Sequence, residues 1–258
     1  MIEREQNAGV LTLRLAHGKA SAMDVELCEA LIRELREAEE SEARAVILTG
    51  SGSIFSAGVD LYRMTDGGAA YVDRFFPALR DSLQALFTFP KPIVAAVNGH
   101  AIAGGCLLAA ACDYRLMSAG RIGVPELLVG VPFPAVAIEI LKFACGRDAQ
   151  SLVYSGRTIS PDEAKLAGLI DEVVAPDFLY TRAEVVAREL AAIDPRNFAI
   201  TKKQLRGDTP PDSDVIKMWS APEVHDHIRE YLGRTVGRTG ASGAQRGAGS
   251  AAARRRRA

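Results

Sequence analysis

An apolar strand, a glycine-rich turn and an apolar helix follow one another in the stretch Pro92-Ile93-Val94-Ala95-Ala96-Val97-Asn98-Gly99-His100-Ala101-Ile102-Ala103-Gly104-Gly105-Cys106-Leu107. Such a junction can point backbone N–H groups at an anion, because the first amides of a helix have no partner within it. Leu107, in the first helical turn, is apolar. Any acid or base that acts beside these amides must come from another part of the chain.

The strand in this stretch has a counterpart earlier in the chain, Ala45–Thr49, which is also continuously apolar. A helix capped by Asp24 precedes that counterpart, and a helical pattern at about 71–88 separates the two strands. Residues Ile2–Gln6 and Val10–Leu15 predict an opening hairpin. Strands that alternate with helices predict an α/β fold with a mostly parallel sheet covered on its faces.

Beyond the glycine-rich turn, Cys112–Met117 and Ile122–Pro125 read as two further short strands, which extend the same sheet or spiral. The back half is mainly helical, and Ser160 is a predicted helix cap. The predicted helices are Ala135–Ala144, Asp148–Tyr154, Pro161–Ala167, Leu179–Ile193, Pro195–Leu205 and Pro222–Leu232. From Gly233 onward the composition cannot bury enough apolar surface to order itself, so we expect a disordered tail.

Composition narrows the class of protein. The chain has 258 residues, 48% of them hydrophobic, which fits one large domain or two small ones. Residues 234–258 contain seven arginines and no acid, which leaves 24 basic against 32 acidic residues in the rest. A net negative body argues against nucleic acid as a partner.

The four cysteines show no CxxC spacing, and no apolar run is long enough to span a membrane. The N-terminus has no hydrophobic signal region. We therefore expect a cytoplasmic protein with reduced thiols and no membrane association.

The chain also contains several weaker motifs. Gly50-Ser51-Gly52 lacks the third glycine of a dinucleotide loop, and Gly105-Cys106 stands where a P-loop needs Lys and Ser or Thr. His225-Asp226-His227 has no further ligand nearby, so no metal site is predicted. Cys106 is a conceivable nucleophile without an evident base, and His100 receives no role.

A stronger pattern combines two backbone loops. Residues Ile54–Leu61 follow the strand Ala45–Thr49, and Ala103–Gly105 follow the strand Ile93–Val97. Adjacent parallel strands would bring both loops to one edge of the sheet, where ligands of α/β folds bind. Two N–H groups that converge on one oxygen form an oxyanion hole, and loss of one donor costs roughly 3–4 kcal/mol of transition-state stabilisation.

At these residues the chain resembles the crotonase superfamily, the enoyl-CoA hydratase/isomerase family. Matching stretches occur in family order over about residues 10–205. They are Phe55–Leu61, Lys91–Gly99, Ala103–Cys106, Cys112–Arg115, Ser155–Arg157, Glu163-Ala164 and Gly168–Asp171. The resemblance implies a crotonase-like ββα spiral core over residues 1–195 and a C-terminal helical region over 196–232. The Arg-rich tail, 233–258, follows.

The resemblance also implies the site. The family's two oxyanion donors fall on the N–H groups of Val59 and Gly104, and its substrate is an acyl-CoA thioester. Its CoA-contacting positions fall on Ala20, Ala22, Ala57, Gly58, Val59, Asp60, Leu61 and Gly104. Coenzyme A is part of the substrate, so no separate cofactor is implied. Homotrimers or dimers of trimers are the implied assembly, with Trp219–Arg234 as a helix that closes over the CoA site.

Family hydratases use two glutamates. The first position is Leu107 in this chain, and the second is Glu126, in Val124-Pro125-Glu126. Hydration needs both a proton acceptor for water and a donor to carbon, whereas one carboxylate suffices to shift a double bond. The chain is thus most similar to the single-glutamate Δ3,Δ2-enoyl-CoA isomerase branch. The dienoyl-CoA isomerase branch is disfavoured, because Pro134 stands where it needs an acid.

We therefore predict an enoyl-CoA isomerase with Glu126 as the proton shuttle. Burial among apolar neighbours would raise the pKa of Glu126 and improve it as a base, although a Glu after Pro also begins surface turns. Glu139 is a second acid that could face the pocket, but a position on the exposed side of an amphipathic helix explains it equally well. Hydratase-like or acyl-CoA hydrolase activity and a non-catalytic acyl-CoA-binding protein stay as alternatives.

Overall fold

The structure is a computed structural model, and it describes residues 1–207, 223, 224, 226 and 228. Residues Met1–Asp208 form one compact unit, which is separate from Thr209–Ala258. The predicted helix over 222–232 lies largely outside the described residues, and the predicted tail over 233–258 lies entirely outside them.

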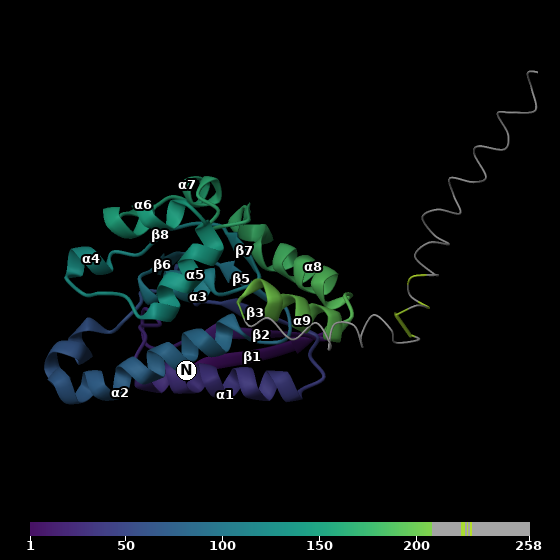
Figure 1. Cartoon of the computed structure of the whole chain (residues 1–258), viewed down its shortest axis with the longest axis horizontal. Helices are drawn as coiled ribbons and strands as arrows, with labels where there is room; N and C mark the ends of the chain where they lie inside the picture. Colours follow the sequence, from purple (N-terminus) through teal and green to yellow (C-terminus); the bar gives the residue numbers. More distant parts are fainter. Residues whose placement is uncertain (208–222, 225, 227, 229–258) are drawn as a thin grey trace, which may run out of the picture. The chain divides into compact units, whose positions relative to one another are not determined.

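A six-stranded sheet runs through the first unit, with helix α1 below its first strands in Figure 1. Its strand order is β1 (Ile2–Asn7), β2 (Val10–Leu15), β3 (Ala45–Thr49), β5 (Ile93–Val97), β7 (Tyr114–Met117) and β10 (Glu172–Val173). The first pair is antiparallel, as the predicted hairpin requires, and every other pair is parallel. Strands β3 and β5 are neighbours, so the segments that follow them leave from the same edge.

A second, four-stranded sheet is built from the shortest strands. Its order is β4 (Ile54–Ser56), β6 (His100–Ile102), β8 (Ile122–Gly123) and β9 (Thr158–Ile159). The first three are parallel neighbours, and the last pair is antiparallel. The two strands predicted at 112–117 and 122–125 therefore belong to different sheets, because the chain passes from one layer to the other between them.

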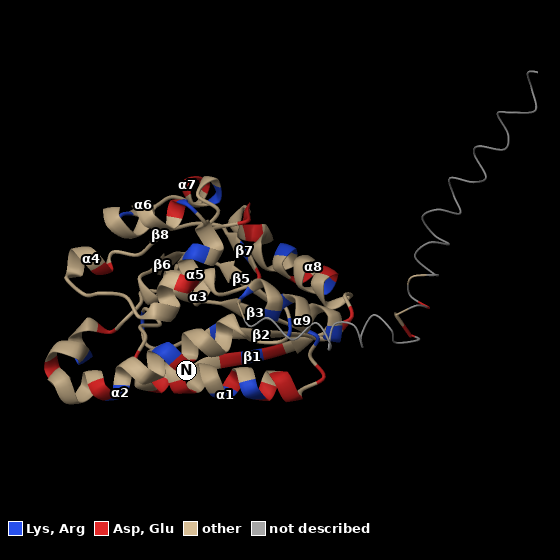
Figure 2. Ribbon diagram, viewed as in Figure 1, with Lys and Arg blue, Asp and Glu red and all other residues tan. Residues whose placement is uncertain are grey.

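Helices account for most of the remaining described residues. They are α1 (Val25–Glu40), α2 (Leu61–Phe87), α3 (Gly104–Ala110), α4 (Glu126–Val129), α5 (Ala135–Cys145), α6 (Asp148–Ser155), α7 (Pro161–Leu166), the 3-10 helix η1 (Pro176–Phe178), α8 (Leu179–Ala191) and α9 (Pro195–Leu205). The predicted caps are confirmed, since Asp24 caps α1 and Ser160 forms a capping box with Glu163. Lys or Arg and Asp or Glu interleave along α1 and α8, as expected of half-exposed helices (Figure 2).

Helix α2 begins well before the predicted 71–88. Asp60 caps it by accepting from the N–H of Arg63, and Gly68 interrupts it with φ 55° and ψ −152°. This left-handed break and Pro77 inside the helix are both signals that normally end a helix. The sequence pattern therefore does not predict the first turns of α2.

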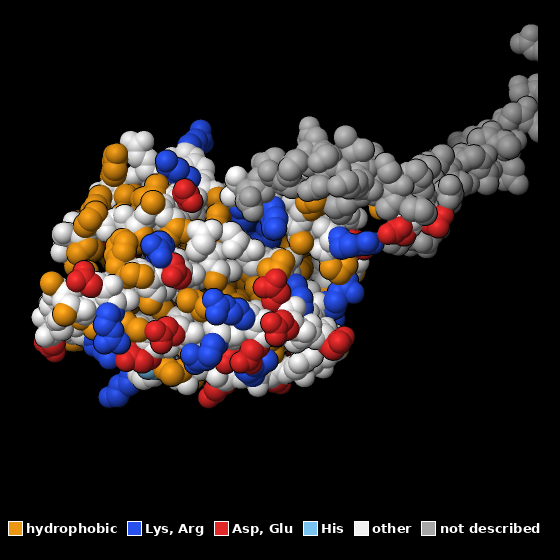
Figure 3. All heavy atoms as spheres, turned by 60° about the horizontal axis from the view of Figure 1, so that its bottom comes forward, with side chains coloured by type: hydrophobic (Ala, Val, Ile, Leu, Met, Phe, Trp, Pro, Cys, Tyr) orange, Lys and Arg blue, Asp and Glu red, His pale blue; other side chains and the backbone are white. Residues whose placement is uncertain are grey.

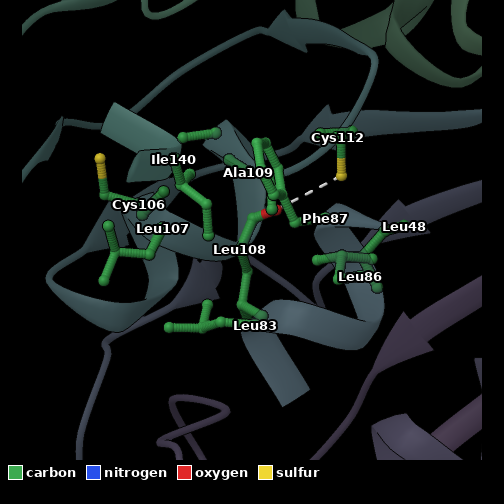
Figure 4. Close-up of a cluster of buried hydrophobic side chains, with 14 of the residues drawn as sticks. Leu48, Leu83, Leu86, Phe87, Cys106, Leu107, Leu108, Ala109, Cys112 and Ile140 are labelled. Atoms are coloured by element: carbon green, nitrogen blue, oxygen red, sulfur yellow. Dashed lines mark hydrogen bonds between the residues drawn. The ribbon is translucent and has the colours of Figure 1, made fainter. Parts of the chain in front are cut away.

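The core lies on both faces of the larger sheet, because successive side chains of a strand point to opposite faces. In β3, Val46 and Leu48 join the cluster under α1, α2, α3 and α5, whereas Ala45 and Ile47 join a second cluster under α8. Figure 4 shows Leu107 and Leu108 of α3 in the first cluster. On the outside, acidic and basic side chains intermix over the face drawn in Figure 3. None of the described helices is long and apolar enough to cross a membrane.

Candidate active site

The two loops singled out in the sequence meet at the end of the smaller sheet. Strand β4 leads into Ala57–Asp60, strand β6 leads into Ala103, and the two strands pair in parallel. The loops touch so closely that a Cβ on Gly58 would lie 2.5 Å from the carbonyl oxygen of Ile102 and 3.0 Å from the amide nitrogen of Gly104. Glycine at 58 also takes φ +82°, so a side chain there is excluded by space and by conformation.

Two backbone amides at this junction are free for a ligand. Neither the N–H of Val59 nor that of Gly104 donates a hydrogen bond to any described residue. Ala103, just before Gly104, has φ 52° and ψ −123°, a conformation that favours glycine. Backbone strain of this kind concentrates at functional sites and fixes the direction of the amide that follows.

Val59 and Gly104 both line a cavity of about 360 Å³. Almost all of its lining residues are apolar. They are Ala57, Val59, Leu61, Met64, Val72, Phe75, Phe76, Leu79, Ile102, Ala103, Gly104, Leu107, Pro125, Glu126, Val129, Val131, Pro132 and Pro134. Among these described lining residues, Glu126 has the only ionisable side chain. The cavity thus suits an apolar group with one reactive position beside a carboxylate.

Glu126 is the first residue of α4, and Pro125 precedes it. Its Oε2 is buried and has no hydrogen-bond partner among the described residues. Burial raises the pKa of Glu126 to about 7, against a smaller lowering by its own backbone amide. A carboxylate without a compensating cation, poised near neutral pH, is able to accept and to return a proton.

The structure separates the other candidate groups. Leu107 lines the cavity, whereas Glu139 lies on the exposed side of α5 and outside the cavity lining. Cys106 is fully buried, and burial raises the pKa of its thiol well above the ordinary range, which argues against a nucleophilic thiolate. His100 is exposed, and its Nδ1 accepts from the N–H of Arg121. No described group of three or more His, Cys, Asp or Glu residues is arranged to hold a metal ion.

The predicted CoA-contacting residues divide into two sets. Ala57, Val59, Leu61 and Gly104 line the cavity with Glu126, whereas the remaining four lie outside its lining. Ala20 is nevertheless close by, since its carbonyl accepts from the N–H of Ala57 at 2.9 Å. The carboxylate of Asp60 caps α2.

Sequence reasoning missed the far wall of the cavity. It consists of Val72, Phe75, Phe76 and Leu79 of α2. Their spacing of i, i+3, i+4 and i+7 places them on one face of the helix, and this spacing can be read from the sequence. An apolar helix face is equally typical of the ordinary core, so the spacing alone does not predict a cavity wall.

Comparisons with known proteins identify the family. The family described as enoyl-CoA hydratase/isomerase matches residues 5–223, and the chain belongs to that family. It is 34% identical over 192 residues to a putative enoyl-CoA hydratase of Thermus thermophilus, covering 72% of this chain and 76% of that protein. It is 32% identical over 215 residues to the mitochondrial enoyl-CoA delta isomerase 1 of Mus musculus, covering 81% and 74%.

A solved structure shows the same fold. The probable enoyl-CoA hydratase EchA3 of Mycobacterium tuberculosis superposes with a TM-score of 0.76 at 30% identity, covering 80% of this chain and 89% of that one. The crotonase-like fold predicted from the sequence is thereby confirmed. Because the relatives bear both hydratase and isomerase names, the choice between these reactions depends on the residues of the cavity.

Proposed function

We propose that this protein is an enoyl-CoA isomerase that converts a 3-enoyl-CoA thioester into the conjugated 2-enoyl-CoA. The observation that carries the proposal is the single carboxylate: Glu126 is the only ionisable side chain among the described residues that line the cavity. Leu107, buried at 2% exposure, occupies the position where a second acid would serve hydration.

The proposed reaction gives the two amides and the carboxylate separate roles. The thioester oxygen accepts from the N–H groups of Val59 and Gly104, and the ionised Glu126 removes a proton from C2. The electron pair of that C–H bond forms the dienolate, whose charge develops on the oxygen between the two amides. Glu126, now protonated, returns the proton to C4, so the double bond moves and no atom is gained or lost. The reaction needs no cofactor beyond the CoA carried by the substrate.

Hydration requires more acid and base groups than these residues provide. Water must be deprotonated by one group while a proton is delivered to carbon, and family hydratases divide this work between two carboxylates. With leucine at 107, Glu126 would have to hold water and manage both protons alone. The apolar wall from α2 also leaves few partners to hold a water molecule in place.

A turnover assay with 3-enoyl-CoA tests the proposal. Wild-type protein is expected to generate the absorption of a conjugated 2-enoyl thioester, and Glu126→Gln is expected to lose about 10²- to 10⁴-fold in kcat while it still binds the thioester. Glu139→Gln is the matched control, because it makes the same chemical change on the exposed side of α5. Its activity should equal that of wild type.

Two parallel assays separate the alternatives. Loss of 2-enoyl absorption would report hydration, and release of free thiol would report thioester hydrolysis. The isomerase proposal is overturned if Glu126→Gln retains activity or if wild type hydrates or hydrolyses faster than it isomerises. Tight binding of enoyl-CoA without turnover in any assay would identify a non-catalytic acyl-CoA-binding protein instead.

A further inference from the structure

Met23 lies in the segment between β2 and α1, directly behind the two free amides. It is 1% exposed and does not line the cavity. Its N–H donates to the carbonyl of Gly58 at 2.7 Å, and its carbonyl accepts from the N–H of Asp60 at 3.0 Å. Met23 and Val59 therefore form an isolated parallel bridge.

The bridge fixes the direction of the Val59 amide. In a parallel bridge, one residue bonds to the neighbours on both sides of its partner, and the partner's own N–H and C=O point the other way. Met23 is the bonding residue in this pair, so the N–H of Val59 points away from Met23. Val59 lines the cavity and Met23 does not, so the side of Val59 that faces away from Met23, to which its N–H points, is the cavity side.

The side chain of Met23 reaches the second amide. Its Sδ fills the space beside Gly104 so closely that a Cβ on Gly104 would lie 2.6 Å from it. The same Cβ would lie 3.8 Å from the amide nitrogen of Val59. One residue thus contacts both donor peptides, Val59 through its backbone and Gly104 through its thioether.

Neighbouring contacts make the segment around Met23 stiff. The carbonyl of Ser21 accepts from the hydroxyl of Ser56 at 2.7 Å. The carboxylate of Asp24 accepts from the N–H of Leu27 at 2.8 Å and from His17 and Arg63 at 2.7 Å each. Movement of Met23 is resisted from both sides, as precise support of a site requires.

We infer that Met23 is a positioning residue, which sets the spacing of the Val59 and Gly104 amides and so tunes how strongly they polarise a bound thioester. This inference rests on the proposed function, because it assumes that the two amides receive the thioester oxygen. Shortening the side chain would let the turn at Gly104 relax toward the vacated space. Misplaced donors weaken the transition state more than they weaken substrate binding.

The test compares truncation with conservative replacement. Met23→Ala and the milder Met23→Val withdraw the side chain from Gly104, whereas Met23→Leu keeps most of the contact. The truncations should lower kcat for 3-enoyl-CoA by about 10- to 100-fold with KM nearly unchanged, and Met23→Leu should restore most of the loss. Met117→Ala is the matched control, because Met117 is equally buried in the same core cluster but contacts neither amide.

A spectroscopic readout separates positioning from stability. A bound aryl-conjugated 2-enoyl-CoA absorbs at longer wavelength when its thioester carbonyl is polarised by the two amides. Met23→Ala or Met23→Val should reduce this red shift, whereas Met117→Ala should lower Tm and keep both the shift and kcat. Met23→Val keeps the measurement possible if the alanine variant fails to fold.

The outcomes for this inference and for the proposed function are distinct. Glu126→Gln should abolish turnover and keep the red shift, because it leaves both amides in place. A wild type with a red shift but no isomerisation would refute the proposed function alone. Full red shift and full kcat in Met23→Val, or an equal loss of both in Met117→Ala, would refute the role of Met23.

Discussion

Two partly buried carboxylates in this chain have opposite surroundings. Asp113, between α3 and β7, has a partner for each oxygen: Oδ2 accepts from Lys202 at 2.7 Å and from the N–H of Ile93 at 2.8 Å, and Oδ1 accepts from Arg206 at 2.7 Å. Glu126 faces an apolar cavity, and its Oε2 has no partner among the described residues.

The difference separates an acid with a structural role from the acid that the proposed reaction uses. Asp113 compensates two buried cations and fastens α9 to the core, and burial lowers the pKa of Lys202 to about 8 even beside that carboxylate. Glu126 keeps its lone pairs free, and burial raises its pKa to about 7. A carboxylate whose hydrogen bonds are all made has little to offer a substrate, so the unpartnered acid is the one suited to proton transfer.

The largest expected effect is the loss of stability when the structural carboxylate, Asp113, is removed. Asp113→Ala leaves Lys202 and Arg206 buried without their counter-charge, and we expect the free energy of unfolding to fall by about 3–5 kcal/mol. Urea unfolding monitored by circular dichroism measures the loss. Asp177→Ala, an exposed position on η1, should stay within about 0.5 kcal/mol of wild type. Equal stabilities of the two variants would contradict the role assigned to Asp113.

The second expectation concerns the pH dependence of the reactive acid. In the proposed reaction Glu126 must be ionised to remove a proton, so kcat/KM for 3-enoyl-CoA should level off above a pH of about 7. Below that pH it should fall about tenfold per unit, since each unit reduces the ionised fraction tenfold. Circular dichroism over the same range controls for unfolding. A profile that is flat down to pH 5 would mean that Glu126 is not the base or that its pKa is not raised.

The smallest effect is a gain in stability from removal of the reactive charge. Since the folded-state pKa of Glu126 lies above its ordinary value, the folded protein binds this proton more tightly than the unfolded chain does, and stability falls as pH rises from about 4.5 to 7. Glu126→Gln avoids that loss. We expect a gain of roughly 1–2 kcal/mol at pH 8, less than the full shift implies because Glu126 is only half-buried and solvent screens its charge.

Thermal unfolding at two pH values measures this gain. The difference between Glu126→Gln and wild type should be much smaller at pH 4.5, where half of the glutamate is already neutral in the unfolded chain, and it should vanish at lower pH. Glu139→Gln should show no gain at either pH, because its side chain is exposed. A destabilised Glu126→Gln at pH 8 would show that the carboxylate has a partner that the structure does not reveal.

The fold was largely predictable from local patterns. The strands Ala45–Thr49 and Ile93–Val97 and the helix Pro195–Leu205 were predicted with the bounds observed, because continuous apolar runs and helix-capping residues are local signals. The start of α2 was not predicted, since Gly68 interrupts the helical pattern. The division into two sheets was not predicted either, because pairing between β4 and β6 depends on contacts far apart in the sequence.

The candidate site was predictable in part, and mainly through the family resemblance. Val59, Gly104 and Glu126 stand in stretches that match the family, and the structure brings all three to one cavity. Met23 was not singled out, because its contact with Gly104 joins residues 81 positions apart and leaves no trace in local spacing. The partners of Asp113 were missed for the same reason, since Lys202 lies 89 positions further along the chain.

The lack of a second ionisable side chain among the described residues of the cavity lining determines where an isotopic label on the substrate should go. Under the proposed reaction, no other described residue of the cavity lining can take over the hydrogen removed from C2, so it leaves Glu126 only to the substrate or to solvent. A 3-enoyl-CoA labelled with deuterium at C2 should therefore deliver part of that deuterium to C4 in ordinary water. The retained fraction measures how fast the dienolate is quenched relative to exchange with solvent, so mass spectrometry of the product would time an intermediate too short-lived to isolate.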